Sequence, residues 1–300
     1  MPDFLFSPGF DPVSLIPLIL LGLAIGFISG LFGVGGGFLL VPFLNSFFGV
    51  PYNLAVGTTL GQMFFTALSG SVRHIFQKHV DIKMAGLLLT GSLPGLLAGI
   101  GIMHSLQNGS IYVVRGRTFT QLDLVMSSLY LVFLLSLGAF MVWETCFRAN
   151  DPETHHGFSL HILVDLSWRP LVNVPSMGER SLSAWLFVLL GAGVGVLSGL
   201  LGVGGGFILM PALVYMMGTT SHYAVGTSLL QTMVVSMVGA ILHFSRGNVD
   251  PGMVLCLSTG SIAGAQLGAF LSSRVCCGWI RKYFGFLVLF SALVVLLKYV

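Results

Sequence analysis

The chain alternates long apolar runs with short polar connections, and the same order of runs occurs twice. In the first half, an apolar run at 15–31 leads to a cluster of glycines, and a shorter apolar run follows at 38–49. Three more long apolar segments come next. Each is close to the roughly 20 residues that a helix needs to cross a bilayer. The pattern predicts an all-α integral membrane protein.

The two halves are copies of one unit. The sequence GFISGLFGVGGGF at 26–38 returns as GVLSGLLGVGGGF at 195–207, an offset of 169 residues between Gly26 and Gly195 that holds without a gap as far as Gly99. Shared apolar composition does not reproduce Gly, Gln, His and Asp at one spacing. We infer a duplication, with repeat 1 at 1–146, a polar connecting loop at 147–182 and repeat 2 at 183–300.

The glycine cluster interrupts the first apolar stretch. A single helix from Leu15 to Gly49 would be about 52 Å long, against a hydrocarbon core of about 30 Å. Glycine adopts left-handed backbone freely and weakens helices, so the cluster is where the chain turns. We expect each repeat to be a Gly-broken helical hairpin followed by three transmembrane helices: hairpin 15–49 with helices 53–74, 84–106 and 123–146, and hairpin 183–218 with helices 222–244, 253–273 and 283–299.

The distribution of cations favours a hairpin that returns to its own side of the membrane. Three crossings per repeat then make the two repeats inverted, with both termini outside the cytoplasm and the connecting loop inside. If 15–49 crossed the membrane once, the cations would divide eight to five between its two sides, whereas the hairpin divides them nine to four. The nine inside are Arg73, Lys78, Lys83, Arg148, Arg169, Arg180, Arg274, Arg281 and Lys282. The four outside are Arg115, Arg117, Arg246 and Lys298. Cytoplasmic loops carry an excess of Lys and Arg, so we predict two inverted repeats in the cell membrane.

Composition narrows the function. Charged residues are 8% and hydrophobic residues 55% of the chain, with a mean hydropathy of +0.95, whereas a soluble domain has about 25% charged residues. The net charge of +3 is spread among loops and is not a nucleic-acid signal.

No Asp or Glu lies in the middle of a predicted span, and no HExxH or GxSxG occurs. We expect no enzymatic activity, no cofactor and no metal site. Without intramembrane carboxylates, the solute is expected to be an anion.

The glycine clusters are the first candidate for a substrate site. A phosphate-binding P-loop would continue with Lys and Ser or Thr, where this chain has Phe. Short helices that begin there would direct backbone N–H groups and positive dipole ends at an oxyanion inside the membrane. Close helix packing is the alternative, since GxxxG spacing recurs and would also permit a homodimer. The candidate residues are Gly35, Gly36, Gly37, Phe38, Gly204, Gly205, Gly206 and Phe207.

A polar stripe on the next helix is the second candidate. Thr58 and Gln62 lie four residues apart on one helix face, and Thr227 and Gln231 repeat them. A polar stripe in an apolar span must face protein or water. We expect these side chains to complete a substrate-binding shell of neutral hydrogen-bonding groups; holding helices together is the alternative.

Two further pairs match across the repeat. His74 and His243 could carry coupling protons, since histidine changes charge near neutral pH; amphipathic anchors at helix ends are the alternative reading. Asp81 and Asp250 each come just before a predicted helix. We expect them to be N-caps.

These motifs resemble the TauE/SafE family. The resemblance is carried by the doubled GL(F/L)GVGGGF, by Pro42 and Pro211 five residues after each cluster, by the AVGT runs, and by the Val-Asp pairs before the third segment. It covers 15–106 and 183–299, while the connecting loop is longer than the family's usual one. The resemblance implies a membrane permease linked to the export of sulfite or organosulfonates.

Residues and resemblance together predict a secondary transporter that exports a small sulfur-containing anion by alternating access, with the lipid bilayer as its surroundings. An anion channel is the alternative within transport. A membrane scaffold or sensor acting through the loop at 147–182 is the alternative outside it.

Overall fold

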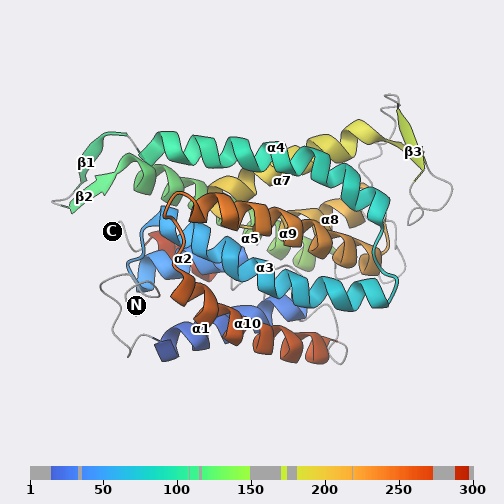
Figure 1. Ribbon diagram of the computed structural model, residues 1–300, viewed down its shortest axis with the longest axis horizontal. Coiled ribbons are helices and arrows are strands. Elements are labelled where there is room, and N and C mark those ends of the chain that lie inside the picture. The colour runs from blue at the N-terminus through green and yellow to red at the C-terminus, as the bar shows by residue number, and fades with distance from the viewer. Residues whose placement is uncertain are drawn as a thin grey trace.

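The computed structural model describes residues 15–32, 36–107, 109–114, 117–148, 170–173, 181–217, 219–272 and 288–296. Helices dominate this part of the chain (Figure 1). Repeat 1 contains α1 (Leu15–Phe32), α2 (Gly37–Phe47), α3 (Tyr52–Phe76), α4 (Ile82–Gln107) and α5 (Gln121–Arg148). Repeat 2 contains α7 (Ala184–Leu201), α8 (Gly206–Pro211), the π-helix η3 (Ala212–Met216), α9 (Ser221–Phe244) and α10 (Pro251–Ser272), and residues 288–296 are also helical.

Two short antiparallel strand pairs were not predicted. Strand β1 (Ile111–Val114) pairs with β2 (Arg117–Thr120) between α4 and α5. Strand β3 (Leu171–Asn173) pairs with β4 (Ser181–Ser183) just before α7. The two pairs lie at opposite ends of the helical body, outside the packed helices (Figure 1).

The helices fit a bilayer in length and in surface. In the described part of the chain, three are long and apolar enough to cross a membrane: Ile82–Gln107, Ala184–Leu201 and His222–Phe244. Large apolar side chains point outward from them, among them Leu97, Leu189 and Ile241, each more than half exposed. Water would disfavour such a surface, whereas lipid tails accept it.

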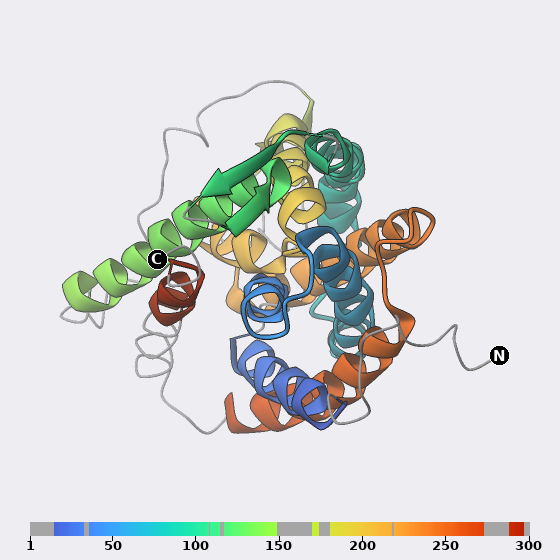
Figure 2. The same cartoon turned by 90° about the vertical axis from the view of Figure 1, so that its left-hand side faces the viewer.

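The main helix pairs join the two repeats. Helix α1 packs along α10, and α4 packs along α7 (Figures 1 and 2). Glycines make the close approach possible: a Cβ on Gly26 would lie under 3.0 Å from the backbone of Ser261, and a Cβ on Gly195 equally close to that of Ser92. These two contacts are related by the offset of 169 residues. The GxxxG faces are thus used inside the chain.

Helices α3 and α9, which hold the same place in the two repeats, pack against each other in opposite directions. Near the start of α3, a Cβ on Gly57 would meet His243 near the end of α9. Further along α3, Gly70 faces Leu229 near the start of α9. The pair crosses the middle of the molecule (Figure 1).

Helix α2 lies inside the arrangement of longer helices. Seen end-on it is surrounded by the longer helices (Figure 2). Most of its residues are buried, including Leu39, Leu40, Val41 and Leu44 at 1% exposure or less. A helix that is apolar on all sides belongs in an interior. Gly36 and Gly37, at the start of this helix, are buried with it.

Candidate functional site

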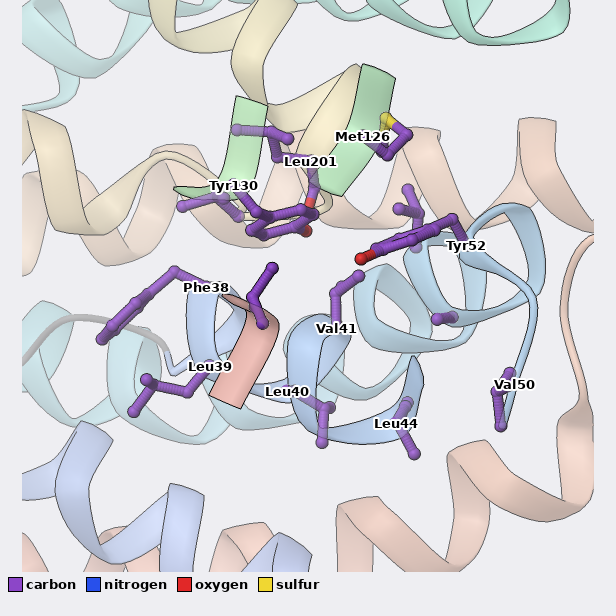
Figure 3. Close-up of a cluster of buried hydrophobic side chains, with 14 of the residues drawn as sticks. Phe38, Leu39, Leu40, Val41, Leu44, Val50, Tyr52, Met126, Tyr130 and Leu201 are labelled. Atoms are coloured by element: carbon purple, nitrogen blue, oxygen red, sulfur yellow. The ribbon is translucent and has the colours of Figure 1, made fainter. Parts of the chain in front are cut away.

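The two glycine clusters meet through the aromatic residues that follow them. The ring of Phe38 stacks on the ring of Phe207, with centroids 4.4 Å apart and planes inclined by 21°. The two residues occupy the same position in the two repeats, and both are buried. Figure 3 shows Phe38 beside Leu39 at the start of α2, with Tyr130 and Leu201 close by. The stack places the starts of α2 and α8 together inside the protein.

The backbone turns through left-handed conformations before each of these helices. Gly36, the N-cap of α2, has φ 66°, and Gly205, the N-cap of α8, has φ 88°. Because glycine has no side chain, neither N-cap offers a side-chain oxygen to the N–H groups of the first helical turn. An L-residue with a side chain pays about 1–2 kcal/mol for such a conformation, which explains why glycine stands there. Gly35 lies outside the described residues.

Met63 fills the space between the clusters. A Cβ on Gly37 would meet the Met63 sulfur, and a Cβ on Gly204 would meet its methyl group and sulfur, all under 3.0 Å. Thr232, the counterpart of Met63 in repeat 2, also approaches Gly204, with its methyl group 3.1 Å from that Cβ. Its hydroxyl is buried and has no hydrogen-bond partner among the described residues. The two repeats thus offer a thioether and a hydroxyl at the same position.

Gln62 belongs to a small polar network. Its Nε2 donates to Thr66 Oγ1 and to Ser261 Oγ, both at 2.7 Å. Its Oε1 is buried without a partner in the described part of the chain. The network ties α3 to α10 and leaves one acceptor unused.

Gln231, the counterpart of Gln62 in repeat 2, lacks the hydrogen bonds that Gln62 makes. It is fully buried, and neither Oε1 nor Nε2 has a hydrogen-bond partner among the residues that the structure describes. The amide lies against the glycine turn, because a Cβ on Gly205 would be 3.4 Å from Oε1 and 3.7 Å from Nε2. Leaving such a group unpaired costs about 1–3 kcal/mol. A polar solute or a water molecule beside Gly205 would remove that cost.

Thr58 and Thr227 have partners from the other repeat. The Asp250 N–H donates to Thr58 Oγ1 at 3.2 Å, and the Asp81 N–H donates to Thr227 Oγ1 at 3.1 Å. The four residues form two equivalent contacts at the offset of 169. The threonines therefore join the repeats. One turn further along, Gln231 lies against Gly205, whereas Gln62 bonds to Ser261 of α10.

His74 and His243 lie away from this centre. His74 is half-buried and its ring lies 6.2 Å from that of His79, centroid to centroid. His243 is fully buried beside Gly57, and neither of its ring nitrogens has a partner in the described part of the chain. Because α3 and α9 are antiparallel, the two histidines occupy opposite ends of the helix pair.

The predicted N-caps are confirmed. Asp81 Oδ1 accepts from the Met84 N–H at 3.1 Å, and Asp250 Oδ1 accepts from the Met253 N–H at 3.0 Å. Both carboxylates stand at the starts of helices, where the dipole stabilises them. Among the described residues there is no group of three side chains arranged to hold a metal ion.

Sequence reasoning missed two contributors: Ser261 and Met63. Ser261 ends the TGS triplet that repeats the one at 90–92, and that repetition was a usable signal. Met63 gives no polar signal at all. Its role follows only from the helix pairing.

Comparison with known proteins agrees with this architecture. The family described as "Sulfite exporter TauE/SafE" matches residues 18–295. The chain is 27% identical over 270 residues to the probable membrane transporter protein YunE of Bacillus subtilis, covering 88% of this chain and 90% of that protein. It is 29% identical over 259 residues to YjnA of the same organism, a probable membrane transporter protein, covering 86% and 91%.

A probable membrane transporter protein of Xylella fastidiosa is 26% identical over 289 residues, covering 94% of this chain and 95% of that protein. No solved structure matches the chain. The relatives are named as membrane transporters and the family match runs through both repeats. This chain therefore belongs to the TauE/SafE family of multi-pass membrane transporters.

Proposed function

We propose that this protein is a secondary transporter that exports a small sulfur-containing anion, sulfite or an organosulfonate, by alternating access. The family description supports the class of solute. The centre of the molecule supports an anion, because its polar groups are amides, hydroxyls and glycine backbone. The carboxylates of Asp81 and Asp250 stand at helix starts away from it.

The two repeats, in this proposal, are inverted in the membrane. The antiparallel packing of α3 and α9 supports inversion, because equivalent helices of inverted copies run in opposite directions. The nine-to-four division of cations supports a cytoplasmic connecting loop at 147–182 and termini outside the cytoplasm. The proposed units are repeat 1 at 1–146 and repeat 2 at 183–300. Rocking of one against the other would expose the centre to each side in turn.

The observation that carries the proposal is the amide of Gln231, which lies against Gly205 and has no hydrogen-bond partner in the described part of the chain. A bound oxyanion would accept from Nε2 and from backbone N–H groups at the glycine turns. Gln62 supplies a matching amide from the other repeat. The proposed substrate-binding residues are Gly35, Gly36, Gly37, Phe38, Thr58, Gln62, Gly204, Gly205, Gly206, Phe207, Thr227 and Gln231.

Proton coupling would use His74 and His243. They are equivalent residues near opposite ends of the α3–α9 pair, and a site near each end is what an alternating carrier needs to load and release protons. His243, buried without a partner among the described residues, would gain a hydrogen-bond partner when a water molecule reaches it.

Flux in proteoliposomes tests the proposal. Purified protein would be assayed with sulfite, sulfate, thiosulfate, taurine, sulfoacetate and a carboxylate control, with and without a pH gradient. We expect saturable movement of one sulfur anion, accelerated by the gradient. Flux that does not saturate would identify a channel, and no flux from folded protein would favour a sensor acting through the loop at 147–182.

Variants test the site. Replacing both Gln62 and Gln231 with Ala should reduce flux at least tenfold, the loss expected for about 1.4 kcal/mol of binding. Gln266→Ala is the matched control, because Gln266 is an exposed glutamine that bonds to Ser69 on the surface. Full flux in the double variant would reject the site.

A further inference from the structure

The two ends of the α3–α9 pair share one backbone arrangement. At one end, the turn after α3 packs on the start of α9, where a Cβ on Gly226 would meet the carbonyl of His79. At the other end, the turn after α9 packs on the start of α3, where a Cβ on Gly57 would meet the carbonyl of Asn248. The threonine hydrogen bonds described above add an equivalent contact at each end.

The side chains that bridge these two contacts differ in chemistry. At one end, Asn53 Nδ2 donates to Asn248 Oδ1 at 2.9 Å. At the corresponding positions of the other end, the ring of His222 stacks on the ring of His79, with centroids 5.2 Å apart and planes inclined by 27°. The asparagine pair keeps the same charge at every pH. The histidine pair does not.

The surroundings of the histidine pair hold further titratable and charged groups. The ring of Tyr223 lies 6.1 Å from that of His79, and His74 interacts electrostatically with His79, His222 and Arg73. Nδ1 of His74 and Nδ1 of His79 are buried without partners among the described residues. Lys78 and Asp81 stand on the turn itself, and Lys83 stands in the first turn of α4. Apart from Asp81, whose Oδ1 accepts from backbone N–H groups of α4, the charges are positive.

We propose that His79 and His222 form a proton-binding latch on one end of the transporter. Neutral, the rings stack and hold the turn between α3 and α4 on the start of α9. Protonated, they repel each other, and the neighbouring cations add to the repulsion, so the turn separates from α9. This latch rests on the proposed function, because alternating access requires the two repeats to part at one end at a time.

The direction of the effect follows from the chemistry of imidazole, which gains a positive charge when it binds a proton. The latch is closed at higher pH and opens as pH falls through the range in which both rings take up protons. The opposite end, bridged by Asn53 and Asn248, does not respond. Acidification on one side would therefore bias the protein toward one orientation. In the proposed topology that side is the cytoplasm.

The test compares the native pair with the pair that the molecule already uses at its other end. His79→Asn combined with His222→Asn keeps a bridge and removes the titration. Spin labels on cysteines replacing Gln77 and Thr220, both exposed at this end, would report the separation of the turn from α9. The background would carry serine in place of Cys146, Cys256, Cys276 and Cys277.

Distances would be measured at about pH 8 and about pH 5.5, because histidine is the side chain that changes charge between about pH 5 and 8. We expect a longer and broader distance distribution at the lower pH with the native pair, and no change in the double Asn variant. His104→Asn, an exposed histidine at the other end of α4, should keep the native response. No pH response with the native pair, or an unchanged response in the double variant, would overturn the latch.

Flux measured on the same preparations separates this proposal from the proposed function. A pH-dependent distance without movement of any sulfur anion would support the latch and reject the transport proposal. Saturable flux without a pH-dependent distance would reject the latch alone. As a complement, Asn53→His combined with Asn248→His should transfer pH sensitivity to the other end, and failure to do so would count against the latch.

Discussion

The hydroxyl of Thr58 accepts a hydrogen bond from the backbone N–H of Asp250 in the other repeat, across 3.2 Å. Thr227 and Asp81 repeat this contact at 3.1 Å. Each bond attaches the start of one helix of the central pair to the turn that follows the other. The two repeats are thereby joined at both ends by the same chemistry, and the consequences can be measured.

Replacing both Thr58 and Thr227 with Val should destabilise the protein. Valine keeps the shape but removes the acceptor, and each buried N–H left unpaired costs about 1–3 kcal/mol. Thermal unfolding in detergent measures the loss. Thr90→Val is the control, because Thr90 is exposed and its hydroxyl bonds within its own helix. Equal midpoints for the double variant and the control would contradict the assignment.

Two glycines of α7 should respond in opposite directions to alanine. A Cβ on Gly195 would lie under 3.0 Å from the backbone of Ser92, whereas a Cβ on Gly193 would meet no described residue within 4 Å. Gly195→Ala should cost about 1–3 kcal/mol through overpacking. Gly193→Ala should gain up to about 1 kcal/mol through helix propensity. Unfolding midpoints that shift together would show that α4 and α7 are not packed this closely.

A role of Gly205 in transport can be distinguished from the backbone strain that alanine causes at any left-handed glycine. Gly205 has φ 88° and Gly247 has φ 72°, so alanine at either position should cost about 1–2 kcal/mol. Only at Gly205 would the new methyl group also meet Val194 and the amide of Gln231. We expect Gly205→Ala to lose more stability than Gly247→Ala, because its methyl group would also overpack Val194, and only Gly205→Ala to lose transport. Equal flux in the two variants would remove the turn at Gly205 from the site.

Tyr130→Phe should weaken the end of α7. The Tyr130 hydroxyl donates to the carbonyl of Leu201, the last residue of that helix, and the ring is fully buried. Removing the donor leaves a buried acceptor unpaired at a cost of about 1–3 kcal/mol. Hydrogen exchange of the amides at the end of α7 should accelerate. Unchanged exchange there would contradict a stabilising role.

The membrane class and the family could be predicted from the sequence, and the family match confirms both. Apolar runs and repeated glycine motifs are local signals. The N-caps Asp81 and Asp250 were equally local and are confirmed. Ser261 could not be assigned to Gln62, because the face of one helix does not reveal which helix will cover it. The strand pair at 111–120 was missed for a related reason: two four-residue strands give too short an alternation to distinguish from a loop.

The orientation of the repeats and the substrate residues stay predictions. The orientation was inferred from a bias in charge, and the substrate residues from a polar stripe. Both inferences concern the membrane and the solute, which are not part of the protein itself. The stack of Phe38 on Phe207 illustrates the limit. Two phenylalanines after two glycine clusters are visible in the sequence, but their contact depends on all the helices that bring the clusters together.

The pairing of α1 with α10 and of α4 with α7 also constrains how the protein is made. The glycine face of α1 is synthesised near the beginning of the chain, and the helix that covers it emerges near the end. Until then a groove of small residues stands open in the lipid, and contacts so distant in sequence form slowly. Repeat 1 therefore cannot finish folding when its helices are inserted, because α1 still lacks α10. Truncated or prematurely terminated chains should be recognised as unfinished by membrane quality control, even when every helix they contain is correctly inserted.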